Sequence, residues 1–112
     1  MKWEGGGGIA GLFASLTVYR DHGARATDNE KHADFTLTGG EWRTLGRRLK
    51  AARFGTLEKR YAPTPVIPDS TFDEVTYRGR SVTVATGGHP PRRLQRLLSY
   101  LWKLHERHQP SR

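Results

Sequence analysis

Hydrophobic and polar residues alternate along three stretches in the first third of the chain, which is the pattern of strands that bury one face. Residues 12–19 read LFASLTVY, and the second half of this stretch is rich in the β-branched and aromatic residues that favour strands. Residues 24–27 and 32–37 follow, and the polar segments 21–23 and 28–31 that separate the three stretches have the composition of turns. We therefore predict three consecutive strands joined by short turns.

Two later stretches repeat apolar residues every three or four positions, as a helix with one buried stripe does. In the first, Thr38 and Glu41 have the spacing of a capping box, and the helix is expected to run to about residue 54 with Gly55 as its terminator. The second is expected over residues 91–108, with Pro91 in its first turn. The two stripes consist of Trp42, Leu45, Leu49 and Ala52 in the first helix and Leu94, Leu97, Leu98, Leu101 and Leu104 in the second.

Between the two helices, a β-hairpin is predicted. Residues 71–77 and 80–85 are β-rich and are joined by Arg78-Gly79, a dipeptide that suits a tight turn. The preceding residues 61–70 contain three prolines, which exclude a helix or a central strand and indicate an extended loop. The order strands, helix, hairpin, helix predicts a single α+β domain over residues 1–112, with an antiparallel sheet of four or more strands and two helices packed on one face.

The predicted core joins the helical stripes to the inward-facing residues of the strands. On the helices it comprises Trp42, Leu45, Leu49, Leu94, Leu97, Leu98 and Leu101, and on the strands Leu16, Val18, Phe35, Val82 and Val84. A chain of this length has room for such a core without disulfide or metal cross-links.

Glycine dominates residues 5–11, which read GGGGIAG. The run contains the spacing Gly6-x-Gly8-x-x-Gly11 of a dinucleotide-binding fingerprint, but that fingerprint follows a buried strand and opens a helix. Here only four residues precede the run, and a strand is predicted after it. We therefore expect a mobile loop whose tip carries Ile9, Leu12 and Phe13.

Composition and charge narrow the class of protein. The chain has 112 residues, with 19 lysines and arginines against 11 acidic residues, and the net charge of +8 raises the expectation of an anionic partner. The absence of cysteine excludes a disulfide scaffold, a thiolate zinc site and a cysteine nucleophile. No segment approaches the ~20 apolar residues of a membrane span, and no apolar stretch typical of a signal peptide opens the chain. We expect a cytoplasmic protein without a membrane partner.

No arrangement of residues predicts an enzyme. There is no Gly-x-Ser-x-Gly elbow, and the acidic residues are scattered without an evident general acid and base pair. The segment His105-Glu106-Arg107-His108 resembles half of a zinc-protease motif, but one residue instead of two separates Glu106 from His108. We interpret it as a solvated helix end, where the helix dipole favours histidine. Neither catalysis nor a bound cofactor or metal is expected.

The basic residues gather on the two predicted helices. If both helices cover one face of the sheet, their outer sides form a positive surface that suits a phosphate backbone. A small nucleic-acid-binding module is therefore one hypothesis, although charged outer faces are ordinary for amphipathic helices. The strands also lack a basic and aromatic RNP-like segment, and no helix-turn-helix spacing is present. The candidate phosphate contacts are Arg43, Arg47, Arg48, Arg93 and Arg96.

Two segments are candidate interaction loops. Residues 5–11 place apolar side chains after glycines, and residues 61–70 carry Val66 and Ile67 among prolines. Exposed apolar loop residues often mark an interaction site, and a loop stiffened by proline loses less conformational entropy on binding. The alternative is that Val66 and Ile67 only cap the core.

The order and spacing of these segments resemble a known family over nearly the whole chain. The segments that carry the likeness are residues 7–11 (GGIAG), 15–18 (SLTV), 37–45 (LTGGEWRTL), 52–54 (ARF), Pro68-Asp69, 77–84 (YRGRSVTV) and Pro90-Pro91. In this order they are similar to the emfourin family of small bacterial inhibitors of thermolysin-like, protealysin-type zinc metalloproteases. The strong basic charge and the pair Asp73-Glu74 depart from the family pattern.

The resemblance implies an inhibitor that fills the active-site cleft of a protease with two neighbouring loops. One loop gives an aspartate to the catalytic zinc, and the other places apolar side chains in the substrate subsites. A catalytic zinc keeps an open position that a carboxylate oxygen occupies at about 2.0–2.2 Å, which expels the attacking water. On this resemblance Asp69 is the candidate zinc ligand, with Asp21 and Asp73 as alternatives. The candidate subsite contacts are Ile9, Leu12, Phe13, Val66 and Ile67.

Overall fold

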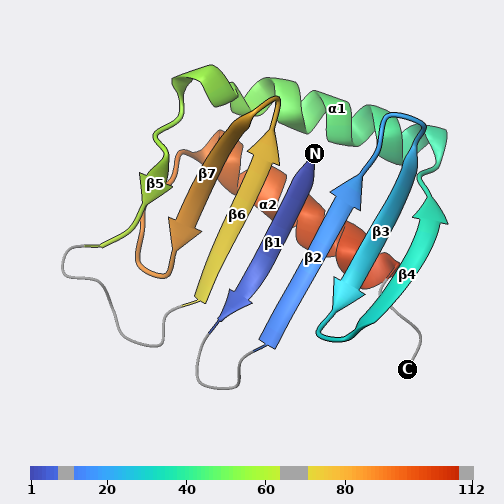
Figure 1. Ribbon diagram of the computed structural model, residues 1–112. Coiled ribbons are helices and arrows are strands. Elements are labelled where there is room, and N and C mark those ends of the chain that lie inside the picture. Colours follow the sequence, from blue (N-terminus) through green and yellow to red (C-terminus); the bar gives the residue numbers. More distant parts are fainter. Residues whose placement is uncertain (8–11, 64–70, 109–112) are drawn as a thin grey trace.

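A seven-stranded sheet with two helices behind it forms the fold (Figure 1). The computed structural model describes residues 1–7, 12–63 and 71–108. The sheet has the order β4-β3-β2-β1-β6-β7-β5, and its neighbours are antiparallel except for the parallel pair β5 and β7. The elements are β1 (Lys2–Gly7), β2 (Leu12–Val18), β3 (Gly23–Asp28), β4 (Lys31–Thr36), α1 (Gly39–Ala52), the short 3-10 helix η1 (Phe54–Thr56), β5 (Arg60–Tyr61), β6 (Thr71–Tyr77), β7 (Arg80–Ala85) and α2 (Arg92–Arg107). The predicted α+β class, with both helices on one face, is confirmed.

The first helix begins as its sequence predicts and ends two residues earlier. The Thr38 hydroxyl accepts from the Glu41 N–H at 3.1 Å, and the Glu41 carboxylate accepts from the Thr38 N–H at 2.9 Å, so the capping box is complete. At the other end Arg53, with φ of 52°, takes the left-handed cap position that we assigned to Gly55. Gly55 instead lies in η1, so that assignment is wrong.

The predicted hairpin is present with its predicted turn. Arg78 and Gly79 both have positive φ, at 51° and 78°, as a tight turn between twisted strands requires. The two strands pair from Phe72 with Ala85 to Tyr77 with Arg80. The extended loop predicted over residues 61–70 needs a correction at its start, because Tyr61 belongs to β5 and pairs with Val84. Residues 64–70 lie outside the described part of the chain.

β1 is the largest departure from the sequence-based prediction, because Gly5, Gly6 and Gly7 lie in the central strand and not in a mobile loop. Their backbones pair with β2 on one side and β6 on the other, which satisfies the peptide groups without any contribution from side chains. Gly5 also faces the helices, where an added Cβ would lie 2.7 Å from Cζ2 of Trp3 and 3.0 Å from Cζ2 of Trp102. The absent side chain therefore makes room for two indoles.

The core lies between the sheet and the helices and is built mostly from the predicted stripes. Of the predicted residues, Leu16, Val18, Leu45, Leu49, Val82, Leu94, Leu97, Leu98 and Leu101 are buried. Trp42, Phe35 and Val84 are only half-buried. Phe35 lies on the edge strand β4, where its ring stacks on His108 with centroids 4.0 Å apart. Trp3, which is not in the predicted set, is fully buried.

Candidate functional site

The two candidate interaction segments are attached to neighbouring strand ends. Gly7, at the end of β1, pairs with Leu12 of β2 on one side and with Thr71 of β6 on the other. The described residues that flank segment 8–11 therefore adjoin the residue that follows segment 64–70, at one end of the sheet (Figure 1). Of the predicted site residues, Ile9, Val66, Ile67 and Asp69 lie outside the described residues, as does the side chain of Leu12.

Two phenylalanines lie beside this end of the sheet, on the face away from the helices. Phe13 and Phe72 both pair with Gly6, from opposite sides of β1. Their ring centroids are 6.5 Å apart, and Phe13 is 38% exposed. The sequence predicts Phe13 as a contact but not its partner Phe72. Strand alternation alone could have placed Phe72 on the outer face.

Side chains from neighbouring turns fix the backbone at these strand ends. The Asn29 side chain accepts from the Phe13 N–H at 3.1 Å, and the Asn29 N–H donates to the Phe13 carbonyl at 2.8 Å. The Thr86 hydroxyl accepts from the Thr71 N–H at 3.0 Å, and the Thr86 N–H donates to the Thr71 carbonyl at 3.0 Å. The backbones of Phe13 and Thr71 are thus held to the sheet. Binding segments attached to a fixed backbone lose less conformational entropy when they bind. Neither contact follows from local sequence.

The two alternative zinc-ligand candidates, Asp73 and Asp21, accept hydrogen bonds from other groups of this protein. Oδ1 of Asp73 accepts from the indole N–H of Trp3 at 3.0 Å and from that of Trp102 at 2.9 Å. Burial raises the pKa of Asp73, and the two indole hydrogen bonds oppose that effect. Asp21 accepts from the Gly23 N–H at 2.9 Å, in the turn between β2 and β3 at the opposite end of the sheet (Figure 1).

The interpretation of residues 105–108 as a solvated helix end is wrong for the two histidines, because His105 is buried and His108 is half-buried, whereas Glu106 and Arg107 are exposed. His105 is buried, and its Nε2 lies 2.7 Å from the Thr27 carbonyl oxygen. His108 Nε2 lies 2.9 Å from Oε2 of Glu41, and Arg107 donates to the same oxygen at 2.9 Å. Burial of Glu41 acts to raise its pKa, but hydrogen bonds from the Thr38 N–H, His108 and Arg107 outweigh it and lower the pKa to about 2.

Positive charge is concentrated in the helical layer. The two helices carry nine lysines and arginines and two acidic residues, whereas the seven strands carry five of each. Nearly all of the net charge of +8 therefore comes from the layer behind the sheet. Between α1 and α2 lies a hollow of about 290 Å³, lined by Arg48, Arg92, Gln95, Arg96, Ser99, Tyr100 and Lys103.

The predicted phosphate contacts do not share one role. Arg43, Arg47 and Arg96 are exposed, and Arg48 is half-buried in the hollow. Arg93 instead donates from Nε to the Ala52 carbonyl and from NH2 to the Thr56 hydroxyl, each at 3.1 Å. The first bond satisfies a carbonyl at the end of α1 and the second reaches a side chain of η1, so Arg93 joins α2 to the end of α1.

Within residues 1–7, 12–63 and 71–108, no group of three or more acidic or histidine side chains is arranged to hold a metal ion. No helix in these ranges is long and apolar enough to cross a membrane. Comparisons of the chain with protein-family models, with curated proteins and with solved structures find no significant match.

Proposed function

We propose that this protein inhibits thermolysin-like zinc metalloproteases by inserting segments 8–11 and 64–70 into the active-site cleft. The observation that supports the proposal is the pairing of Gly7 with both Leu12 and Thr71, because it attaches the two segments to adjoining strand ends. The similarity of the segment order to that of the emfourin family also supports a role as a protease inhibitor. The chain itself supplies no catalytic step.

Asp69 is the residue proposed to reach the protease zinc. A carboxylate oxygen at the open coordination position displaces the water that attacks the peptide bond. Asp73 is less suited, since Oδ1 already accepts two indole hydrogen bonds. Asp21 is less suited because its turn lies at the other end of the sheet.

Apolar side chains around the zinc ligand are proposed to fill the substrate subsites. Phe13 is the described member of this set, and its exposure leaves it free to enter a subsite. Burial of one such side chain stabilises a complex by at most about 1.5–3 kcal/mol. The other members of the proposed set are Ile9, Leu12, Val66 and Ile67.

The test is hydrolysis of a peptide substrate by a thermolysin-like protease at rising concentrations of the purified protein. Asp69→Asn preserves shape but removes the anionic ligand, so inhibition should weaken strongly. Asp21→Asn is the matched control, because its amide oxygen can still accept from the Gly23 N–H. Equal inhibition by the two variants would rule out Asp69 as the zinc ligand. Full protease activity with excess wild-type protein would rule out the proposed function.

A second candidate function rests on the segregation of charge into the helical layer. Such a surface suits a nucleic-acid backbone, with Arg43, Arg47, Arg48 and Arg96 as the contacts. Binding to a random duplex should weaken with salt, with a slope of log K against log salt of about −0.9 for each phosphate neutralised. Arg47→Ala with Arg96→Ala should weaken it more than Lys31→Ala with Arg60→Ala, which removes equal charge from the strands. No duplex binding at low salt would exclude this function.

A further inference from the structure

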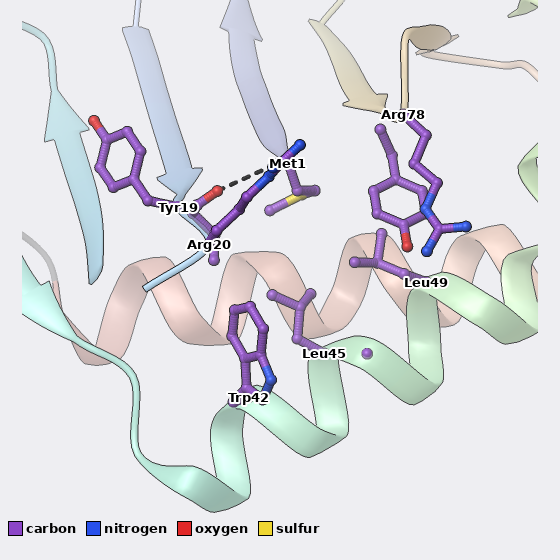
Figure 2. Close-up of a pocket in the computed structure, with 10 residues that line it drawn as sticks. Met1, Tyr19, Arg20, Trp42, Leu45, Leu49 and Arg78 are labelled. Carbon is purple, nitrogen blue, oxygen red and sulfur yellow. Dashed lines mark hydrogen bonds between the residues drawn. The ribbon is translucent and has the colours of Figure 1, made fainter. Parts of the chain in front are cut away.

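A groove runs between α1 and the end of the sheet opposite to Gly7 and Thr71. It consists of two adjoining hollows of about 560 and 570 Å³ that share Gly46, Leu49 and two residues of the β6–β7 hairpin, Tyr77 and Arg78. Figure 2 shows Trp42, Leu45 and Leu49 projecting from α1 toward the strand ends that carry Arg20 and Arg78.

The floor of the groove is apolar and aromatic. Leu45 and Leu49 are buried beneath it, and the half-buried ring of Trp42 stacks on His22 with centroids 4.0 Å apart. Gly46 is exposed, and a Cβ added there meets no atom within 4 Å. The face of α1 therefore has a gap at Gly46, with room for side chains of a bound molecule.

The rim of the groove is cationic. Five exposed side chains line it, namely Arg20, Lys50, Arg53, Arg78 and Arg80. In the part of the chain that the structure describes, none of these five forms an ion pair and none of the lining residues is acidic. The Arg78 guanidinium lies 5.2 Å from the centroid of the Tyr77 ring, which holds this cation at the mouth of both hollows.

The length of the groove fits a short stretch of polypeptide. It follows α1 from Trp42 to the cap residue Arg53, which at about 1.5 Å per residue is roughly 17 Å. An extended chain covers that length in about five residues. A bare phosphate backbone would leave the apolar floor uncovered, whereas a peptide with alternating side chains offers apolar groups to the floor and carboxylates to the rim.

We propose that this groove binds an extended, acidic segment of a partner protein, with alternate apolar side chains on Leu49, Tyr77 and Trp42 and carboxylates facing the cationic rim. The complementary charge steers the encounter, and the apolar floor holds the bound segment. The site is separate from the proposed protease-binding end, so the two can be occupied together.

The probe is a fluorescein-labelled peptide of about six residues that alternates glutamate and leucine, followed by fluorescence anisotropy. Wild-type protein should bind it, and should bind a peptide with lysine in place of glutamate at least about tenfold more weakly. Gly46→Glu places a bulky anion in the gap and should lower affinity by about tenfold or more, while Gly46→Ala, the matched control, should bind like wild type.

Arg20→Glu is a second test of peptide affinity, and it leaves the sequence of α1 unchanged. Lys31→Glu of β4 is its control, because it makes the same change of charge away from the groove. Only the variant at Arg20 should lose peptide affinity. Equal affinity of wild type, Gly46→Glu and Arg20→Glu would overturn the proposal. So would displacement of the peptide by single-stranded DNA of equal charge as readily as by unlabelled peptide. Protease inhibition should be the same for all these variants, so a failure here is distinguishable from failure of the inhibitor function.

Discussion

The indole N–H of Trp3 donates to Oδ1 of Asp73 across strands β1 and β6, over 3.0 Å. Trp3 is fully buried, and Trp102 from α2 donates to the same oxygen. The T-shaped contact between the two indoles, with centroids 4.6 Å apart, extends the link from the central strand to the helix. One carboxylate oxygen therefore ties the middle of the sheet to the layer behind it.

Asp73→Ala should destabilise the fold by about 1–3 kcal/mol, because the buried Trp3 N–H loses its acceptor. Urea unfolding followed by tryptophan fluorescence measures the change. Asp34→Ala is the control, since it breaks only the exposed pair with Arg25 and should cost less than about 1 kcal/mol. Equal losses for the two variants would mean that the Asp73 hydrogen bonds add nothing to stability.

Glu41 should make the free energy of unfolding depend on pH in the acidic range. Its pKa is lowered from 4.5 to about 2 in the folded state, so its contribution is complete above pH 4.5 and is lost as the pH falls toward 2. Glu41→Gln keeps an acceptor for the Thr38 N–H and removes the charge that faces Arg107 and His108. The difference in unfolding free energy between wild type and Glu41→Gln should therefore shrink over this window.

Glu106→Gln, at an exposed position of α2, is the control for that titration. Its difference from wild type is measured over the same pH range and is the baseline against which the change for Glu41→Gln is judged. A pH-independent difference for Glu41→Gln would contradict the assignment of the lowered pKa to the contacts of Glu41.

Two glycines should respond in opposite directions to the same substitution. Gly46→Ala should stabilise the protein by about 0.5–1 kcal/mol, because the position is in the helix interior and an added Cβ meets no atom. Gly79→Ala should destabilise it by about 1–2 kcal/mol, because φ is 78° there. Thermal unfolding of both variants tests the pair, and a shift in the same direction would contradict the backbone argument.

Leu101→Ala should cost about 2–5 kcal/mol, because Leu101 is fully buried between α2 and the rest of the core. Lys103→Ala, two residues away on the exposed side, should change stability by less than about 0.5 kcal/mol. Chemical denaturation compares the two. A small loss at Leu101 would mean that α2 packs on the sheet less closely than its burial indicates.

The parts of the fold that the sequence predicts well are those fixed by local chemistry. Thr38 and Glu41 bond each other over three residues, and Arg78-Gly79 closes a hairpin between adjacent strands. The strand at Gly5–Gly7 was not predictable in this way, because glycine carries no alternation and its pairing partners lie in β2 and β6. The burial of His105 did leave a signal, since it follows Leu101 by four positions on the apolar stripe.

In the candidate site, too, local features are predictable from the sequence and contacts between distant residues are not. The sequence indicates two interaction segments, but their attachment to adjoining strands depends on the position of β1 between β2 and β6. The exclusion of Asp73 depends on Trp3 and Trp102, which are far from it along the chain. Arg93 matches the other helical arginines in sequence, and only the approach of α2 to the end of α1 gives it a separate role.

The proposed function requires that this protein block the zinc-containing cleft of a thermolysin-like protease. The most direct measurement is a competition assay in which inhibition is titrated at several concentrations of a small hydroxamate that occupies the catalytic zinc. Binding of the protein and of the hydroxamate should be mutually exclusive, so that the apparent inhibition constant of the protein rises linearly with the hydroxamate concentration. An inhibition constant that does not change with hydroxamate, or no inhibition at all, would contradict it.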